Sequence, residues 1–550
     1  MEKICKITGK PFTISKAEQE YCRSNDLPLP TIAPYERLRQ MFYFYNPSFL
    51  YNGICSFSGK PMLSIVPPDK GFKVYDIGTW MDDTAWDPMS YGRDFDFSRP
   101  FFAQFAELMK EVPIPSRSVV LSTMENSDYT NGVSQVKNCY LIFDCDVGED
   151  CYFSYQMQRV KNIIDSINVR DSELCYGCKH IKDCYNLRFC ENCVHCSDAT
   201  FLFNCRNVRN SYGSTNLSNK EYCWFNEQLT KEEFEIRSAK LNLGSRKELT
   251  RAREEFEIFK KAAFLKAVNG QSNENCSGDY LNECKKCTDT FFSTQAEDCE
   301  YCVQANGGKN CYFYTTFGNN VELVYNSAVC GHNVYNVKFC LGSFVNVRDL
   351  EYCMHVGFGA NNCFGCIGLR KKQYCIFNKQ YPKEAYFELL KRIKNHMVLT
   401  GEYGQFFPSE LSPFHYNKSE ASLFFPLTRE EALARELSWE DEIIEEFSTD
   451  YIIPDDIREV PDSILEQTLK CSVSGKKYRI IKQELALYRH WQVPIPLIAP
   501  LERIKISCQA LRLQTIIERP CSHCHKSIRT AYNNPEQSVL CEECYSKAMI

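Results

Sequence analysis

Hydrophobic and polar positions recur with a short period in the middle of the chain. From about residue 126, Asn, Asp or Leu, then Cys or Ile, then Tyr or Ile returns every twelve residues. The first such units are Asn138-Cys139-Tyr140, Asp150-Cys151-Tyr152, Asn162-Ile163-Ile164 and Leu174-Cys175-Tyr176. A period this short is typical of stacked coils, because helical repeats need about 33 or 34 residues. Two units together make a coil of about 24 residues, which predicts a parallel β-helix with Cys, Ile, Phe and Tyr inside and Asn in the turns.

The same repeat of polar and hydrophobic positions returns later in the chain. It follows a segment whose sequence predicts two helices within residues 231–267. Tyr222-Cys223 and Phe225-Asn226 match Tyr374-Cys375 and Phe377-Asn378 at a shift of 152 residues. We therefore expect a first β-helix-like array at 125–230, a helical insert at 231–270, and a second array, a copy of the first, at 271–382.

The two ends of the chain are also related to each other. A shift of 466 places Cys5, Gly9 and Lys10 on Cys471, Gly475 and Lys476. Residues 1–80 and 466–550 are thus each predicted to form a double zinc-ribbon-like module. Between these parts lie an aromatic and acidic collar at 81–124, with a helix near 100–111, and a helix followed by an acidic linker at 383–465. The expected fold class is mainly β with helical inserts: two β-helix-like solenoid arrays flanked by duplicated zinc-ribbon-like modules.

Only the last ribbon keeps a full set of metal ligands. Its cysteines form two C-x₂-C pairs separated by sixteen residues, namely Cys521, Cys524, Cys541 and Cys544. Two thiolates on each of two tight turns can complete the tetrahedral shell of one Zn²⁺ ion at about 2.3 Å. A shell of four protein ligands leaves no open position for substrate, so we predict one structural zinc ion.

The three related turn pairs have lost most of their ligands. The corresponding positions are Cys5, Thr8, Ala33 and Glu36; Cys55, Ser58, Asp76 and Thr79; and Cys471, Ser474, Ala499 and Glu502. None offers the three or four soft ligands of a stable zinc site. These modules are expected to keep the ribbon fold without metal.

Further C-x₂-C pairs lie within the repeats. They are Cys175/Cys178, Cys190/Cys193, Cys193/Cys196, Cys284/Cys287, Cys299/Cys302 and Cys363/Cys366. They could bind additional metal or form a redox dithiol. The favoured interpretation is that Cys fills the core as a small apolar residue, because it alternates with Ile, Val and Tyr at equivalent positions.

Composition narrows the class of protein. The 550 residues include 64 basic and 70 acidic side chains, a net charge of −6 that gives no overall attraction to nucleic acid or to an anionic membrane. Basic residues near Arg503 and Arg529 are not clustered enough to reverse this, so nucleic acid stays a minor alternative. No signal peptide or long apolar span is seen, and 32 cysteines would be reduced thiols in the cytoplasm, which is the expected location.

Signatures of enzymes are scarce. No dinucleotide-binding, Walker A, serine-hydrolase or H-E-x-x-H motif is present. Asp94 and Asp96, among aromatic residues, could bind a cation or a sugar. The alternation Asp94-Phe95-Asp96-Phe97 is more simply a strand with one wet and one buried face.

The chain resembles an uncharacterised family of long, Cys-rich zinc-ribbon and solenoid proteins common in candidate-phylum bacteria. The matching segments are Cys5-x-x-Thr8-Gly-Lys, Pro28-x-Pro30, Tyr91–Phe97, Asn126–Tyr129, Asn138–Leu141 and Phe364–Leu369. In that family the positions of Thr8, Ala33 and Glu36 are more often Cys, and this departure argues against metal binding by the N-terminal module. The resemblance implies an architecture and lends no catalytic residues.

The leading hypothesis is a non-enzymatic binding or scaffold protein that presents repeated surfaces to a protein or polymer partner and whose terminal modules pack together. One alternative is an enzyme or binder that acts on a carbohydrate or other polymer in a solenoid groove, using Asp94 and Asp96. Another is a thiol or metal reservoir built from the Cys ladder.

Overall fold

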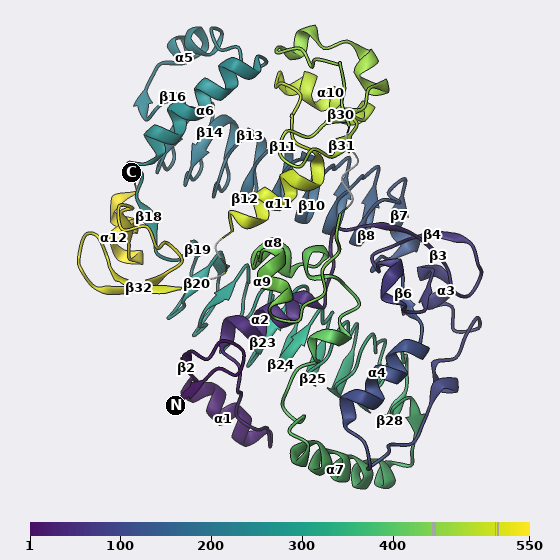
Figure 1. Cartoon of the computed structure of the whole chain (residues 1–550). Helices are drawn as coiled ribbons and strands as arrows, with labels where there is room; N and C mark the ends of the chain where they lie inside the picture. Colours follow the sequence, from purple (N-terminus) through teal and green to yellow (C-terminus); the bar gives the residue numbers. More distant parts are fainter. Residues whose placement is uncertain (443–446, 512, 514–515, 550) are drawn as a thin grey trace.

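The structure, a computed structural model, describes residues 1–442, 447–511, 513 and 516–549. It is mainly β, and most of its strands belong to a solenoid (Figure 1). An 11-stranded sheet is parallel except for its last hairpin. Its strands are β7 (Met124–Glu125), β8 (Asn131–Lys137), β9 (Phe143–Glu149), β10 (Tyr155–Ile164), β11 (Ile167–Tyr176), β12 (Lys179–Lys182), β13 (Tyr185–Arg188), β14 (Ser197–Phe203), β15 (Tyr212–Thr215), β16 (Cys223–Trp224) and β17 (Glu227–Gln228).

A second set of strands follows in the same manner and ends in a 7-stranded sheet, β23 to β29, with a closing hairpin of its own. The strands are β18 (Leu265–Lys266), β19 (Gly270–Gln271), β20 (Gly278–Asp279), β21 (Leu281–Asn282), β22 (Thr290–Phe291), β23 (Tyr312–Thr315), β24 (Val321–Ala328), β25 (Val334–Lys338), β26 (Val347–Glu351), β27 (Asn361–Phe364), β28 (Gln373–Ile376) and β29 (Lys379–Gln380).

One coil of the solenoid contains about twelve residues, and the 24-residue coil expected from the sequence is wrong. Tyr155 pairs with Ile167, twelve positions on, and Val321 pairs with Val334, thirteen positions on. The cause is the backbone, which adopts positive φ at nearly every third residue, as at Asn162 (53°), Asp165 (52°) and Asn168 (52°). Each left-handed residue turns the chain, so three-residue sides close a four-sided coil within twelve residues.

Asn and Asp are frequent at these corners because they enter the left-handed region more readily than other residues with a side chain. They also bond to the equivalent residue one coil away. Asn207 Nδ2 donates to Asn219 Oδ1 at 2.7 Å, and Asn186 Nδ2 donates to Asp198 Oδ1 at 2.8 Å. Such ladders tie successive coils together.

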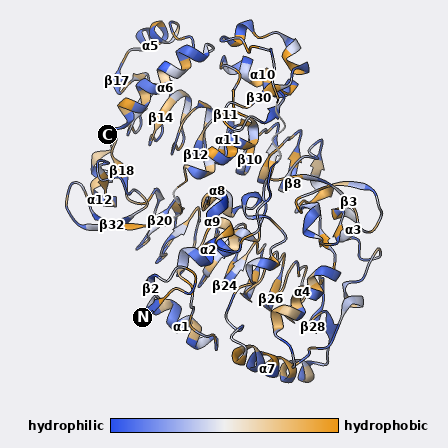
Figure 2. Ribbon diagram, viewed as in Figure 1, coloured by the Kyte–Doolittle hydropathy of each residue, from blue (hydrophilic) through white to orange (hydrophobic). Residues whose placement is uncertain are grey.

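The inside of the coil is narrow. Only one residue in three points inward, and in the first sheet these residues are small or of medium size. The buried set is Val133, Val136, Cys139, Ile142, Cys145, Cys151, Met157, Val160, Ile163, Val169, Cys175, Cys178, Ile181, Cys184, Leu187, Cys190, Cys193, Cys196, Ala199, Leu202, Cys205, Val208, Leu217 and Cys223. No aromatic side chain belongs to this set, so the prediction of Phe and Tyr inside the coil is wrong for the first sheet; the second set of strands does bury Tyr314 among its inward residues. Along the strands these hydrophobic positions are interspersed with hydrophilic ones (Figure 2).

Cys and Ser are interchangeable at the inward positions of this solenoid. The Cys178 thiol donates to the carbonyl oxygen of Tyr176 at 3.4 Å. One coil earlier, the Ser166 hydroxyl donates to the carbonyl oxygen of Ile164 at 2.9 Å and accepts the backbone N–H of Cys178. Both side chains are compact and satisfy the backbone in the same way, so the Cys ladder follows from packing.

Helices cover the coils. They are α1 (Lys16–Ser24), α2 (Pro34–Tyr43), α3 (Ile77–Met81), α4 (Phe101–Glu111), α5 (Lys231–Ser238), α6 (Arg246–Lys260), α7 (Lys383–Leu399), α8 (Ala421–Phe424), α9 (Arg429–Leu433), α10 (Lys482–Trp491), α11 (Pro500–Gln509) and α12 (Glu542–Ala548). The helix near 100–111 and the two helices within 231–267 are thus confirmed. Residues 443–446 of the expected linker lie outside the described residues.

The predicted strand at Asp94–Phe97 is wrong. Phe95 is buried, but Phe97 is 36 % exposed and the segment has no strand partner among the described residues. In the described part of the chain, no helix has both the length and the apolar composition needed to cross a membrane.

A layer of helices joins the two sheets. Helix α2 contacts β23, β24 and α8, α8 contacts α11, and α11 contacts β11. Beside α8, the buried Glu420 accepts hydrogen bonds from Tyr155 Oη at 2.6 Å and from Thr316 Oγ1 at 2.9 Å. One carboxyl group therefore binds both sheets.

Asp144 lies at a nearby corner and accepts a hydrogen bond from Tyr45 Oη at 2.6 Å. Burial raises its pKa to about 7, although the hydrogen bonds from Tyr45 and Tyr155 oppose the shift. The folded protein therefore binds more protons at this site than the unfolded chain does over the range between the ordinary carboxyl pKa and pH 7. Stability at this site must fall as the pH rises through that range.

We predict that Cys178→Ser shifts the urea midpoint little, a loss within about 1 kcal/mol, because Ser already occupies the same position one coil earlier. Cys178→Phe should lower stability by about 1–3 kcal/mol or more, since the lumen has no room for a ring. Equal losses in the two variants would contradict the narrow-lumen explanation.

We also predict that Asp144→Asn flattens the decline of stability between about pH 4 and pH 7, measured by thermal unfolding across that range. Asp183→Asn, at an exposed corner, is the control and should leave the profile unchanged. A profile that is as steep in Asp144→Asn as in the parent would show that Asp144 does not titrate as described.

Candidate functional site

The four predicted metal ligands come together at the C-terminal end. Cys521 and Cys524 lie in the turn between β32 (Ile517–Pro520) and β33 (Ser527–Thr530), and Cys541 and Cys544 lie at the start of α12. Their Sγ atoms all lie within 4.8 Å of one another, and those of Cys524 and Cys541 are 3.7 Å apart. Sulfurs bound at about 2.3 Å to one tetrahedral ion are roughly 3.8 Å apart. The group could therefore hold a metal ion.

Hydrogen bonds in the turn also lower the pKa of one of the four thiols, that of Cys521. Burial raises the pKa of the Cys521 thiol, but hydrogen bonds from the backbone N–H groups of Cys524, Cys541 and His523 lower it to about 6. The bond from Cys541 N to Cys521 Sγ is 3.3 Å long. A thiol that ionises this readily is prepared for metal ligation.

Three other hairpins share this hydrogen-bond pattern: β1 (Glu2–Ile4) with β2 (Pro11–Thr13), β3 (Tyr51–Ile54) with β4 (Pro61–Ser64), and β30 (Leu469–Lys470) with β31 (Lys477–Tyr478). In each, a Cys N–H donates to the carbonyl oxygen of Lys10, Lys60 or Lys476 at 2.8–2.9 Å, as Cys521 does to Lys526. In each, the Cys Sγ accepts a backbone N–H from the second turn, from Ala33, Asp76 or Ala499, at 3.3–3.4 Å.

These three hairpins lack the remaining sulfurs. Thr8, Ser58 and Ser474 stand where the fourth hairpin has Cys524. Their single Cys is buried and lies in the same frame of backbone hydrogen bonds. The frame of the turn therefore does not depend on a complete ligand set.

The solenoid thiols are arranged differently from the tetrad. Among the described residues, the tetrad is the one group of three or more Cys, His or acidic side chains whose ligand atoms are close enough for a metal ion. The solenoid cysteines are buried, apart from the partly exposed Cys276, and none is in a disulfide. They are inward residues of the coils, both three positions apart within one coil, as Cys190, Cys193 and Cys196, and stacked from coil to coil.

The module that carries the Cys tetrad contacts the first sheet and the second set of strands. Its β34 (Val539–Leu540) pairs in parallel with β18, which leads into the second sheet. Tyr545 Oη donates to Asn204 Oδ1, at a corner of the first sheet, at 2.8 Å. Arg529 Nη2 lies 2.8 Å from Asp289 Oδ1, at a corner of the second set of strands. The module thus holds the junction between the sheets.

The N-terminal end reaches the same place. Tyr35 Oη donates to Asp289 Oδ2 at 3.4 Å and accepts the backbone N–H of Ile516 at 3.4 Å. The two ends of the chain are therefore in contact, as the hypothesis of packed terminal modules requires.

Neither Asp94 nor Asp96 lines either of two hollows in the structure, of about 870 Å³ and about 520 Å³. Asp94 lies 2.7 Å from Lys379 Nζ and accepts a hydrogen bond from Tyr381 Oη. Asp96 accepts hydrogen bonds from Ser98 in a local turn. Both carboxylates are exposed and already bound.

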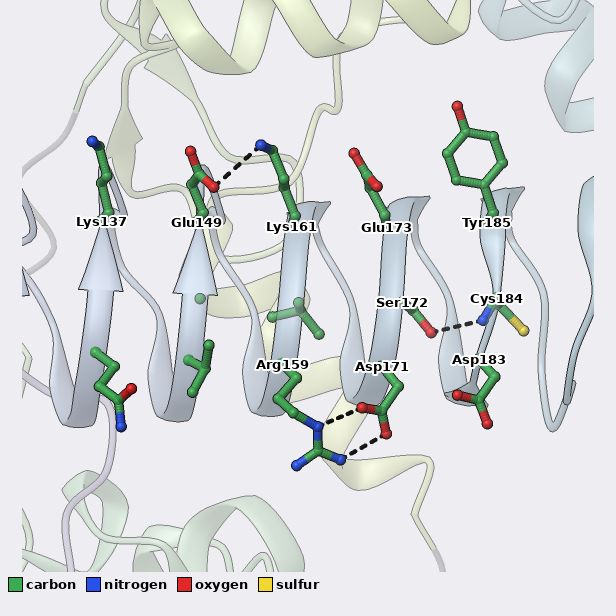
Figure 3. Close-up of a pocket in the computed structure, with 14 residues that line it drawn as sticks. Lys137, Glu149, Arg159, Lys161, Asp171, Ser172, Glu173, Asp183, Cys184 and Tyr185 are labelled. Atoms are coloured by element: carbon green, nitrogen blue, oxygen red, sulfur yellow. Dashed lines mark hydrogen bonds and ion pairs between the residues drawn. The ribbon is translucent and has the colours of Figure 1, made fainter.

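The first sheet has a charged outer face that was not predicted from the sequence. Equivalent positions of successive coils place Lys137, Glu149, Lys161, Glu173 and Tyr185 in one row (Figure 3). A second row holds Arg159, Asp171 and Asp183 (Figure 3). In the sequence, the residues of the first row are twelve positions apart and alternate in charge from Lys137 to Glu173, and this spacing is the signal that could have revealed the row.

The rows border an open hollow of about 870 Å³. Neighbouring charges pair across coils: Lys161 Nζ lies 3.2 Å from Glu149 and Arg159 Nη2 lies 2.7 Å from Asp171 Oδ2. The pairing holds the charges in a fixed pattern over several coils.

Neither a protein-family model nor a curated protein matches the chain.

We predict about one bound metal ion per purified chain, measured by inductively coupled plasma mass spectrometry. Cys544→Ala should abolish binding, and Cys471→Ala, in an incomplete hairpin, should leave it unchanged. Because the ligands must be thiolates, the ion should leave as the pH falls. Several ions per chain, or loss in Cys471→Ala, would contradict the assignment of the site.

Proposed function

We propose that this protein is a non-enzymatic binding scaffold: a rigid solenoid, closed by a structural zinc ribbon, that binds a protein or polymer partner along the outer face of its first sheet. The outer face carries this proposal. Its charges alternate at a fixed spacing, they come from successive coils, and they border a hollow that is open to solvent. A stacked solenoid supplies such an extended surface without further machinery.

Zinc is the proposed metal because four thiolates at tetrahedral spacing suit this ion. Four protein ligands close the coordination shell, so the ion has no position for substrate and its role is structural. This role agrees with the contacts of the module, which join Asn204, at a corner of the first sheet, to Asp289, at a corner of the second set of strands.

The shared hydrogen-bond pattern supports the proposal that all four hairpins are copies of one zinc-ribbon module, of which three have lost the ion. The matching closing hairpins of the two sheets, β16–β17 and β28–β29, support two solenoid arrays that arose by duplication. This architecture is the one that the resemblance to the Cys-rich zinc-ribbon and solenoid family implies.

The cytoplasm is the proposed location. The cysteines are free thiols, which agrees with a reducing compartment. The net charge of −6 favours a protein or neutral polymer as partner over a nucleic acid.

The test exchanges the two members of an ion pair. Lys161→Glu combined with Glu149→Lys keeps the pair and the net charge but inverts the charge pattern of the face. The control is Arg429→Asp with Asp441→Arg, an exposed pair outside the face. Partners recovered from an extract of the source cells are quantified by mass spectrometry. We predict that the first exchange removes a partner that the parent and the control retain, with at least a tenfold drop in recovery.

Identical recovery by all three proteins would contradict the use of this face. Thermal unfolding checks that each exchange leaves the fold intact. Because the pairs are exposed, each exchange should change stability by less than about 1 kcal/mol.

A further inference from the structure

A cavity lies between the first sheet and the corners of the second. It has a volume of about 520 Å³, within the range of about 300–1,000 Å³ that is usual for small-molecule sites. One wall comes from β8 to β11 and the opposite wall from the turns between β22 and β27. The N-terminal region closes it, with Trp80 and Ile114. Separate parts of the chain therefore build one partly open cavity.

Most of the wall is apolar, and much of it is aromatic. The aromatic side chains that line it are Phe44, Tyr45, Trp80, Phe317, Phe344, Phe358 and Phe414. Aromatic rings pack well against flat apolar bodies. The wall therefore suits a ligand with an aromatic body.

Two polar rows face each other across the cavity. The first sheet supplies Ser134, Asp146, Gln158 and Arg170, at equivalent positions of four successive coils. The second set of strands supplies Asn306, Asn319 and His332, which also follow one another coil by coil. The rows meet where Arg170 Nη1 donates to Thr294 Oγ1 at 3.2 Å.

Arg170 is a partly buried cation that forms no ion pair in the described part of the chain. Among the described residues, no carboxylate oxygen lies within 4.0 Å of its guanidinium nitrogens. The adjacent Asp171 is bound to Arg159 on the outer side of the coil. A charge in such a place is costly unless an opposite charge meets it.

The neighbours of Arg170 also present donors. Gln304 Oε1 accepts the backbone N–H of Phe317, and Asn306 Oδ1 accepts the backbone N–H of Thr294. With their oxygens bound in this way, the amide NH₂ groups of Gln304 and Asn306 are left to donate. Guanidinium and amide donors together match an oxyanion.

We propose that this cavity binds a small aromatic oxyanion, a carboxylate or a phosphate ester, with its anionic group at Arg170 and its ring against the aromatic wall. Nothing in the proposed scaffold role requires this site, since the outer face lies on another side of the coil. Asp146, two coils from Arg170, repels an anion and so directs it to the Arg170 end. Arg117, also in the wall and 8 % exposed, has no carboxylate partner among the described residues and adds positive charge.

The test is isothermal titration calorimetry of the full chain with three matched probes: 2-naphthoate, 2-naphthyl phosphate and the neutral 2-naphthamide. We expect one anion to bind per chain, more tightly than the amide. The anion that binds more tightly shows whether the site takes a carboxylate or a phosphate ester. Arg170→Gln should weaken anion binding about ten- to hundredfold, as expected for the loss of a charged hydrogen bond, and should not change binding of the amide.

Arg170→Lys keeps the charge and should weaken binding less than Arg170→Gln. The control is Arg206→Gln, because Arg206 occupies the equivalent position three coils later, is exposed and does not line the cavity. Thermal unfolding verifies that each variant folds. The proposal is overturned if neither anion binds at millimolar concentration, if the amide binds as well as the anions, or if the Arg170→Gln and Arg206→Gln variants bind alike.

Discussion

The left-handed turn at every third residue is the constraint on which the rest of this structure depends. It closes a coil within about twelve residues and leaves one inward side chain in three. The lumen of the first sheet accepts Cys, Ser, Val, Ile, Leu, Ala and Met, the second set of strands also buries Tyr314, and the corners favour Asn and Asp. Because every coil has the same turns, side chains at equivalent outward positions lie one coil apart. Lumen and surface pattern therefore have one cause.

The period of twelve, the helices at 231–267 and the Cys tetrad were legible in the sequence because each depends on residues close together or on a fixed spacing. The size of the coil was not, since a left-handed corner occupied by Phe153 or Leu174 looks like any apolar position. In the sequence, a twelve-residue unit is equally compatible with half of a 24-residue coil. Asp94 and Asp96 were misplaced on a strand because alternation alone cannot show that Phe97 faces solvent.

The cavity could not have been predicted, because Arg170, Thr294 and Trp80 meet only after two sheets and the N-terminal region pack together. The helix layer α2–α8–α11 and the contacts of Asp289 with Tyr35 and Arg529 set that packing. The charged outer face is an intermediate case. The alternation of charge between residues twelve positions apart is present in the sequence. Only the structure of the coil shows that the side chains from Lys137 to Glu173 lie side by side. Rigid coils thus hold both surfaces in place, and the zinc ribbon would hold the junction between them.

The most direct test of the narrow lumen is alkylation of the native protein with iodoacetamide in the presence of a chelator, followed by peptide mass spectrometry. Exposed Cys524 and partly exposed Cys276 should react, together with the other members of the tetrad once its metal is removed. The inward cysteines of the solenoid should stay unmodified until the chain is unfolded by urea. Rapid reaction of many inward cysteines, such as Cys190 and Cys302, in the folded protein would contradict the account.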